Sequence, residues 1–281
     1  MTAMDDAPAA LVDRARWPID DLDGPVGRRV LNVCHADMSA TGCCNLAGFL
    51  TPEGAALLAA EAARLEPHLY WKDSTRNAYF TADDPALAAD DPRRRFFRIV
   101  MGQVAGDVIP ATSRLRRLHA DPAMIEFVRR ALALPALHPR ADAFQDVNII
   151  VLPEGGVQPW HYDQNHFSVT LLLRAPMRGG AFEFVPGLRR PGEENLGEVA
   201  RLFRGEHPGV VRPPREAGTL TLFRGENAMH RVTEIAGPRA RVTAILSYDE
   251  APGLWAPDDV NAMIYGPRVA ALLAARNRVP V

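Results

Sequence analysis

Two histidines and one carboxylate form the most specific chemical pattern in the sequence. His161 and Asp163 lie two residues apart, and His230 follows a strand-like run at residues 218–223. Residues two apart on a strand point to the same side, so His161 and Asp163 can present an imidazole and a carboxylate to one point. Two histidines and a carboxylate on one face of an octahedron leave three positions open, as in non-haem Fe(II) sites that activate O2. A structural zinc would prefer four closed ligands, often thiolates, whereas a hydrolytic zinc stays possible.

An arginine follows these residues at a spacing that suits a cosubstrate. Arg241 comes eleven residues after His230, at the start of an apolar run, and a planar guanidinium binds a carboxylate bidentately. Thr243 lies on the same side of that strand and could donate a further hydrogen bond. We therefore predict that Arg241 and Thr243 bind the distal carboxylate of a 2-oxo diacid whose keto acid end chelates the metal. Arg239, which lies in a Gly-Pro turn, is the alternative.

Five further residues are candidates for substrate binding. Arg76 could hold a substrate carboxylate and Asp146 an ammonium group, and the alternative for each, favoured for Arg76, is a surface charge. Asn165 shares the strand side of His161 and Asp163 by the two-residue rule. Trp160 and Trp255 could wall the pocket or pack in the core.

Composition excludes several classes of protein. The chain has 281 residues, a net charge of -2 and 47% hydrophobic residues, which is ordinary for a globular protein and gives no basic field for nucleic acid. The apolar runs are far shorter than the ~20 residues that span a bilayer, and the N-terminus lacks the apolar region of a secretory signal. The three cysteines form no spaced pairs. We expect a cytoplasmic protein with reduced thiols that binds a small molecule and neither nucleic acid nor membrane.

The elements that must position these residues divide the chain into a helical and a strand-rich part. We expect a loose tail over 1–25 and one catalytic domain over 26–281. In it, a helical part spans about 45–140, with helices starting after Thr51 and Asp121 and a loop between them. A strand-rich core spans about 141–250, and a terminal helix covers about 267–277.

Short apolar runs closed by Gly and Pro predict the strands of that core. They cover 147–152, 167–173, 181–185, 219–223 and 242–248, with a helical insertion around 196–203. No regular alternation with helices is present, so an antiparallel sandwich or barrel is favoured over a parallel sheet.

Several segments of the sequence resemble a known family. The segments His161-Tyr162-Asp163, His230-Arg231-Val232 and Arg241-Val242-Thr243 look like the HxD…H…R signature of Fe(II)/2-oxoglutarate-dependent dioxygenases. Segments 144–153, 179–186 and 246–249 are similar to standalone amino-acid hydroxylases grouped with carrier-independent radical halogenases. The resemblance implies a mainly β fold with flanking helices, a double-stranded β-helix of the jelly-roll, cupin-like kind. It also implies Fe(II) as cofactor, with 2-oxoglutarate and O2 as cosubstrates.

One residue distinguishes the two outcomes that the resemblance allows. The halogenases have a small residue in place of the metal carboxylate, which leaves a position for chloride, whereas this chain has Asp163. The resemblance therefore implies an enzyme that couples oxidative decarboxylation of 2-oxoglutarate to hydroxylation of an unactivated C–H bond. The expected substrate is a small polar metabolite such as a free amino acid or a derivative. The alternatives are the same chemistry on another metabolite or a protein side chain, and a non-catalytic cupin-like binding protein.

Overall fold

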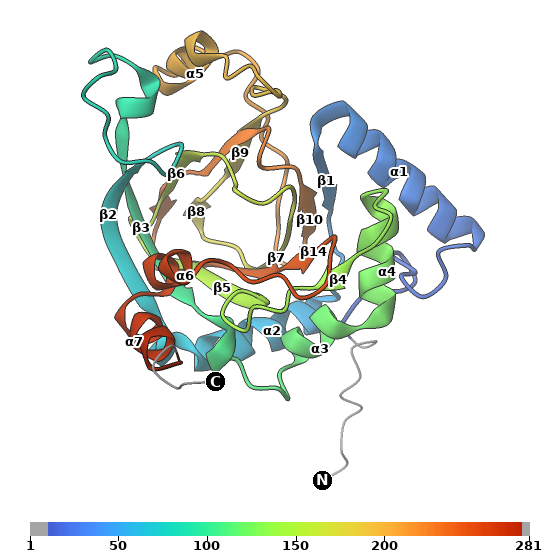
Figure 1. Cartoon of the computed structure of the whole chain (residues 1–281). Helices are drawn as coiled ribbons and strands as arrows, with labels where there is room; N and C mark the ends of the chain where they lie inside the picture. The colour runs from blue at the N-terminus through green and yellow to red at the C-terminus, as the bar shows by residue number, and fades with distance from the viewer. Residues whose placement is uncertain (1–10, 277–281) are drawn as a thin grey trace.

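The computed structural model describes residues 11–276, and two facing antiparallel sheets form its centre (Figure 1). The larger sheet contains, in spatial order, β1 (Cys43–Leu46), β10 (Leu220–Phe223), β7 (Ser168–Arg174), β13 (Arg241–Leu246), β5 (Val147–Leu152), β3 (Phe96–Val104) and β2 (Tyr70–Asn77). The smaller sheet contains β6 (Gln158–His161), β11 (Met229–Val232) and β9 (Phe182–Val185). Two further strand pairs are β12 (Ile235–Ala236) with β8 (Arg178–Gly179), and β14 (Tyr248–Asp249) with β4 (His138–Pro139). This arrangement is the expected jelly-roll-like core with flanking helices.

Helices cover the outer face of the larger sheet and the ends of the fold (Figure 1). They are α1 (Pro25–Thr41), α2 (Pro52–Arg64), α3 (Arg114–Ala120), α4 (Pro122–Ala131), α5 (Leu196–Phe203), α6 (Asp258–Tyr265) and α7 (Pro267–Arg276). Short 3-10 turns occupy Glu66–His68, Pro92–Arg94 and Gly106–Val108. Thr51 caps α2 by accepting a hydrogen bond from the Gly54 amide, and Asp121 caps α4 in the same way through Ala123.

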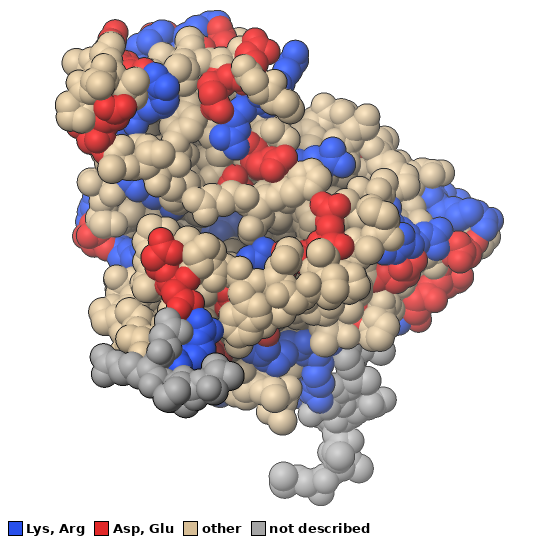
Figure 2. Space-filling view, viewed as in Figure 1, with Lys and Arg blue, Asp and Glu red and all other residues tan. Residues whose placement is uncertain are grey.

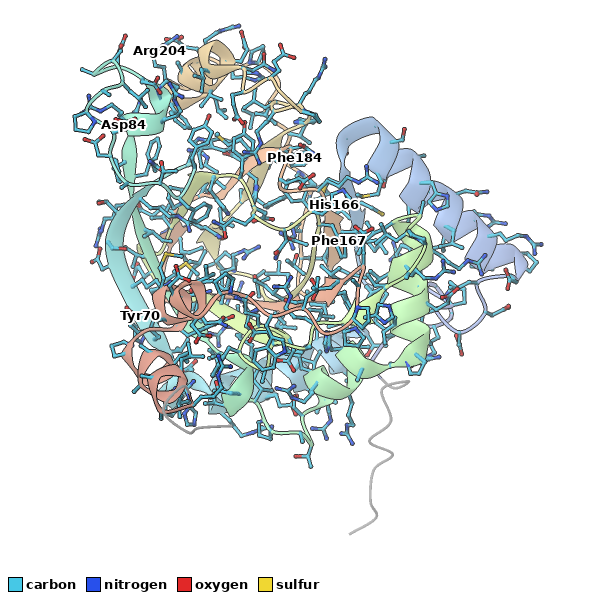
Figure 3. The ribbon with its side chains drawn as sticks, viewed as in Figure 1. Tyr70, Asp84, His166, Phe167, Phe184 and Arg204 are labelled. Atoms are coloured by element: carbon cyan, nitrogen blue, oxygen red, sulfur yellow. The ribbon has the colours of Figure 1, made fainter. Side chains whose placement is uncertain are left out.

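Strand alternation gives the larger sheet two different faces. On β7, Val169, Leu171 and Leu173 belong to the large core that includes the helices. The opposite side faces the smaller sheet. A second core lies between the two sheets and includes Ile150 of β5 and Phe184 of β9, which is labelled in Figure 3. Polar residues among the inward positions of β7 and β13 therefore lie in the space between the sheets, which we call the lumen.

The strand-rich half follows the expected boundaries closely, and the helical half does not. Strands occur in all five predicted runs, and α2, α4, α5 and α7 occur where helices were expected, although residue 277 lies outside the described residues. The predicted helical part is corrected, because β2 and β3 lie in its expected loop and extend the larger sheet. Helix α6 was not predicted.

The predicted loose tail is also corrected within the described residues. Leu11, Val12, Ile19 and Leu22 are buried in the main core, and Val12 forms a bridge with Leu50. The carbonyl oxygen of Leu11 also accepts a hydrogen bond from the Thr51 amide at the start of α2, at 2.9 Å. Burial of these apolar side chains stabilises an ordered segment. Residues 1–10 of the expected tail lie outside the described residues.

No helix within residues 11–276 combines the length and the apolar character needed to cross a bilayer.

Candidate metal centre

The two facing histidines lie on neighbouring strands of the smaller sheet. His161 ends β6 and His230 lies on β11, and the antiparallel pairing places the two residues opposite each other, with ring centroids 4.1 Å apart. Asp163 lies just beyond the end of β6, not on the strand itself. Its backbone amide donates to the Gly225 carbonyl oxygen at 3.0 Å, which holds the carboxylate beside the histidines.

One ligand atom from each of the three residues converges on a single point. Asp163 Oδ1 lies 3.3 Å from His230 Nε2 and 3.7 Å from His161 Nε2. All three ligand atoms lie within 4.8 Å of one another, as a shared metal ion requires. Within the described residues, this is the one group of its kind.

Hydrogen bonds around the centre prepare the ligand atoms for a metal. Nδ1 of His161 donates to the Pro159 carbonyl oxygen at 2.8 Å, and Nδ1 of His230 donates to the Ala228 carbonyl oxygen at 3.0 Å. These bonds fix the tautomer that leaves each Nε2 lone pair for the ion. Ser168 Oγ donates to Asp163 Oδ2 at 2.7 Å. The residues present therefore fit an Fe(II) ion with three protein ligands.

The electrostatic environment keeps these groups in their ligating forms. Burial lowers the pKa of His161 well below its usual value, and the neighbouring His230 and Arg76 lower it further. Burial by itself would raise the pKa of Asp163, but His230, His161 and the Ser168 hydroxyl together hold it below its usual range. A neutral imidazole and an ionised carboxylate are the forms that bind a divalent cation.

Arg241 and Thr243 lie on the inward side of β13, in the lumen. Both are buried, and Arg241 Nη1 donates to Thr243 Oγ1 at 2.5 Å. Ile245 continues the same side of the strand and lines the cavity that contains His161. The Nε of Arg241 is buried without a hydrogen-bond partner among the described residues.

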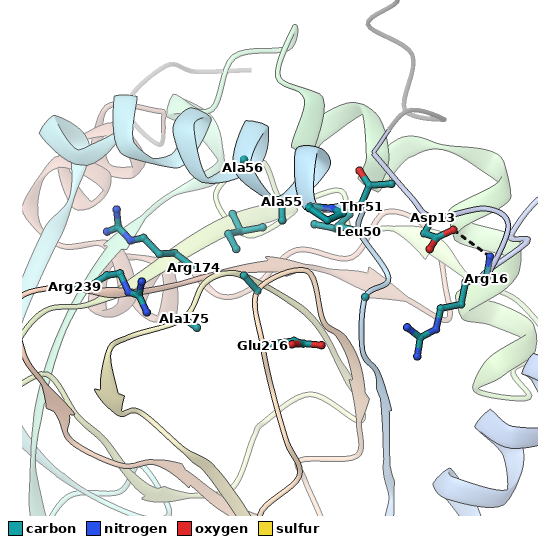
Figure 4. A pocket seen from close by; sticks show the side chains of 14 residues that line it. Asp13, Arg16, Leu50, Thr51, Ala55, Ala56, Arg174, Ala175, Glu216 and Arg239 are labelled. Carbon is teal, nitrogen blue, oxygen red and sulfur yellow. Dashed lines mark hydrogen bonds between the residues drawn. The ribbon is translucent and has the colours of Figure 1, made fainter.

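Arg239, the alternative to Arg241, lies outside the lumen. It is exposed and donates from Nη2 to the Pro176 carbonyl oxygen at 3.1 Å. Figure 4 shows it in a surface cavity of about 620 Å³ that is also lined by Arg174 and by Ala55 of α2. This cavity contains none of the three candidate metal ligands. Position therefore favours Arg241 for any contact with a metal-bound cosubstrate.

A cavity of about 930 Å³ opens in front of the candidate metal centre and is lined by His161 and Asp163. Its other walls come from β2, β3, β5 and α6. Figure 2 shows the molecular surface hollowed beside α6, with Lys or Arg atoms inside the hollow. Such a concave site of this size suits a small molecule.

Arg76 is the candidate substrate residue that the structure places most directly in this cavity. Its Nε and Nη2 atoms are buried without a hydrogen-bond partner among the described residues, and its guanidinium stacks 4.4 Å from the Phe80 ring centroid. Burial lowers the pKa of Arg76 to about 10, opposed by the nearby Asp163 carboxylate. Asn165 also lines the cavity, where its Oδ1 accepts from Arg140 Nη2 at 3.5 Å.

The prediction that Asp146 meets a substrate ammonium is wrong in this structure. Asp146 forms an ion pair with Arg116 and accepts a hydrogen bond from the Val147 amide. It does not line the cavity, because β5 begins after it and carries Asn148 and Ile150 inward instead.

The two tryptophans do not wall the cavity. Trp160 precedes His161 on β6, so its side chain points to the opposite side, where it packs with Leu202 beneath the Arg231 guanidinium. Trp255 is 50% exposed and lies 5.7 Å from the Arg276 guanidinium. The following residues, 256 and 257, line the cavity in its place.

Several polar residues of the site were missed in the sequence. Lys72 and Gln103 come from the unpredicted strands β2 and β3 and are joined by a hydrogen bond of 3.1 Å. Arg140 lines the cavity and is ion-paired to Asp249 at 2.6 Å. His166, labelled in Figure 3, does not belong to the site. It lies at the surface, where its Nδ1 is 2.9 Å from Glu250 Oε1. If residues 70–77 had been recognised as a strand, the alternation of side chains along it would have identified Lys72 as a candidate site residue.

Comparisons with known proteins identify a matching family and solved structures of similar fold. The family model described as halogenase D matches residues 27–254. AviO1 from Streptomyces viridochromogenes Tue57 superposes with a TM-score of 0.55 and 17% identity, covering 82% of this chain and 97% of that chain. The 2-oxoglutarate-dependent epimerase SnoN from nogalamycin biosynthesis gives a TM-score of 0.54 and 18% identity, covering 82% and 86%.

A further solved structure of similar fold contains 2-oxoglutarate and a nickel ion. HygX from Streptomyces hygroscopicus, with nickel and 2-oxoglutarate bound, gives a TM-score of 0.51 and 15% identity, covering 76% of this chain and 85% of that chain. Among curated proteins, nothing matches the chain. The family match covers most of the chain, and the solved structures share its fold. The chain therefore belongs to the halogenase D family and shares the fold of these solved structures, and its His161, Asp163 and His230 are placed so that they could hold one metal ion.

Proposed function

We propose that this protein hydroxylates an unactivated C–H bond of a small, carboxylate-bearing metabolite, such as a free amino acid or a derivative, at the expense of 2-oxoglutarate and O2. The observation that carries the proposal is the position of Asp163, whose carboxylate reaches both histidines. Fe(II) held by His161, Asp163 and His230 would supply, with O2 and 2-oxoglutarate, the oxidant for this reaction.

The residues around the centre divide into a cosubstrate side and a substrate side. In the lumen, Arg241 and Thr243 would hold the distal carboxylate of 2-oxoglutarate, which orients its keto acid end toward the metal ligands. On the cavity side, Arg76 would pair with the substrate carboxylate through its unpartnered Nε and Nη2 atoms. Binding energy from this ion pair would fix the C–H bond to be attacked.

Apart from its cations Arg76, Lys72 and Arg140, the cavity lining favours neutral polar groups on the substrate. Apart from Asp163, the carboxylate that lines the cavity is Asp73, and it is already paired with Arg98 at 2.8 Å. Side-chain amides line the cavity at Gln103, Gln145, Gln158, Gln164 and Asn165. An amine of the substrate would therefore meet amide oxygens, so a strongly basic side chain is disfavoured.

Halogenation is the second candidate, because the matching family is described as halogenase D. The carboxylate of Asp163 argues against it, since it takes the position that chloride would need. SnoN is described as an epimerase, so this fold also serves other outcomes of C–H activation. Product analysis in chloride buffer separates hydroxylation from halogenation.

The direct test is succinate release with Fe(II), ascorbate, 2-oxoglutarate and a panel of amino acids and N-acyl amino acids. We expect a substrate to increase succinate release, and Arg76→Gln to raise its KM at least about tenfold while substrate-independent decarboxylation persists. Arg201→Gln, which removes a surface arginine of α5 that does not line the cavity, is the matched control. Failure of the Ni(II)-loaded protein to bind 2-oxoglutarate in calorimetry would refute the proposal.

A further inference from the structure

A second arginine, Arg215, is half-buried and extends toward the lumen from the segment before β10. Arg215 donates from Nη2 to Thr170 Oγ1 at 3.0 Å, and its guanidinium carbon lies 5.0 Å from the Phe182 ring centroid. Asn45 fixes the adjacent backbone by donating to the Pro214 carbonyl oxygen at 2.7 Å. Phe182 in turn lies 5.9 Å from the His230 ring. Arg215 therefore reaches from the loop into the region between β7 and the candidate metal ligands.

Arg215 and Arg241 are anchored on adjacent strands of the larger sheet. Their hydroxyl acceptors are Thr170 on β7 and Thr243 on β13. In the strand pairing Thr243 lies opposite Leu172, two residues from Thr170 on the same side of β7. Diagonal neighbours of this kind are within reach of long side chains.

Arg241 is buried and Arg215 is half-buried, and neither has an anionic partner among the described residues. The Nε atom of each is buried without a hydrogen-bond acceptor. Burial lowers the pKa of Arg241, and the field of Arg215 lowers it further, which shows that the two charges repel each other. Burial likewise lowers the pKa of Arg215 to about 10. Two uncompensated cations, one buried and one half-buried, are costly unless an anion binds between them.

We propose that Arg215 is a second cosubstrate-binding residue, which shares the distal carboxylate of 2-oxoglutarate with Arg241. This inference rests on the proposed function, because it assumes 2-oxoglutarate in the lumen. The carboxylate has two oxygens, so one guanidinium can approach from β13 and the other from the side of β7. The distal carboxylate would then make charge-assisted contacts with both Arg215 and Arg241, and a 2-oxo monoacid, which lacks that carboxylate, would make neither contact.

The test compares two ligands that differ only in the distal carboxylate. The affinities of 2-oxoglutarate and 2-oxovalerate for the Ni(II)-loaded protein are measured by calorimetry. We expect Arg215→Gln to weaken 2-oxoglutarate binding at least about tenfold and to leave 2-oxovalerate binding unchanged. Arg215→Lys should restore part of the loss, and Arg239→Gln, an exposed arginine near the same strand, should change neither affinity.

The outcomes separate this inference from the proposed function. If the wild-type protein does not bind 2-oxoglutarate, the proposed function fails. If it binds and Arg215→Gln leaves 2-oxoglutarate affinity unchanged, or weakens both ligands equally, Arg215 does not read the distal carboxylate. Should Arg215→Gln fail to fold, Thr170→Val removes the acceptor that orients Arg215 and should weaken only 2-oxoglutarate binding. If Thr170→Val leaves the ratio of the affinities for 2-oxoglutarate and 2-oxovalerate unchanged, the inference is overturned.

Discussion

At the scale of single residues, the proposal of hydroxylation depends on Asp163. Its Oδ1 faces both histidines, while Oδ2 is held by the Ser168 hydroxyl. The residue types and the sequence spacing of His161, Asp163 and His230 were sufficient to identify them as candidate metal ligands. It could not show that Asp163 lies beyond the end of β6, because the end of pairing depends on contacts with the distant residue Gly225.

Removing the carboxylate should change the outcome of turnover. In Asp163→Gly we expect hydroxylation to fall at least about 100-fold, since one of three ligands is lost, and a position to open for chloride. Mass spectrometry of products in chloride and chloride-free buffers provides the measurement. Ser168→Ala keeps the ligand and should reduce activity far less. Undiminished hydroxylation by Asp163→Gly would count against the assignment of this ligand.

Gly225 should be required for reasons of space alone. A Cβ at this position would lie 2.1 Å from Asp163 Oδ2, so a side chain must displace the carboxylate. We expect Gly225→Ala to weaken divalent-metal binding by about 10- to 100-fold, as measured by competition with a chromogenic chelator. Gly197→Ala in α5 is the matched control, because a Cβ there has open space. Equal metal affinity in the two variants would show that the contact with Gly225 is unimportant.

At the scale of elements, the turn after β2 positions the substrate side. Asn77 is fully buried, and its Nδ2 donates to the carbonyl oxygens of Thr81 and Arg93 at 3.0 and 2.8 Å. Its Oδ1 accepts from the amides of Tyr79 and Thr81, each at 3.1 Å. This closed turn follows directly on Arg76, and it includes Phe80 in a left-handed conformation with φ 58°. The side chain of Asn77 thus fixes the end of β2.

Loss of this network should destabilise the fold and loosen substrate binding together. We expect Asn77→Ala to lower the free energy of unfolding by about 2–4 kcal/mol, since several buried polar groups lose their partner. Denaturant titration measures this change, and the substrate KM should rise in parallel. Asp84→Ala lies in the same segment but at the surface, and should cost less than about 1 kcal/mol. A smaller effect of Asn77→Ala than of Asp84→Ala would contradict this role.

The elements differed in how far the sequence could predict them. β5 is apolar except for Asn148 because both of its faces are buried, so its boundaries were correct. β2 contains Lys72, Ser74 and Arg76, which read as a polar loop. Their polarity follows from the cavity that they line, and that environment exists only after the chain has folded.

At the scale of the whole molecule, a chain of nearly balanced charge gathers cationic side chains at its cavity and lumen. The net charge is -2, yet Arg76, Lys72 and Arg140 line the cavity, Arg241 is buried in the lumen and Arg215 lies half-buried beside it. Composition could not predict this separation, because it depends on which face of each strand is inward. It suits a protein whose ligands are anions.

The charge of the cavity should make substrate binding depend on pH. Burial and then repulsion by Arg76 lower the pKa of Lys72 to about 8, while Arg76 itself stays protonated until about pH 10. We expect the KM for a carboxylate substrate to rise as the pH increases through about 8, because Lys72 then loses its positive charge. Lys72→Met should remove this step. A wild-type KM that is constant from pH 7 to about 9 would contradict the prediction.

The central claim is that oxygen, and not halide, is delivered to the substrate. The most direct measurement is the product mass after turnover under isotopically heavy O2 in chloride buffer, with a substrate that increases succinate release. We predict one heavy oxygen atom in the product and one in succinate. A chlorinated product, or a hydroxylated product without heavy oxygen while succinate is formed, would contradict the account.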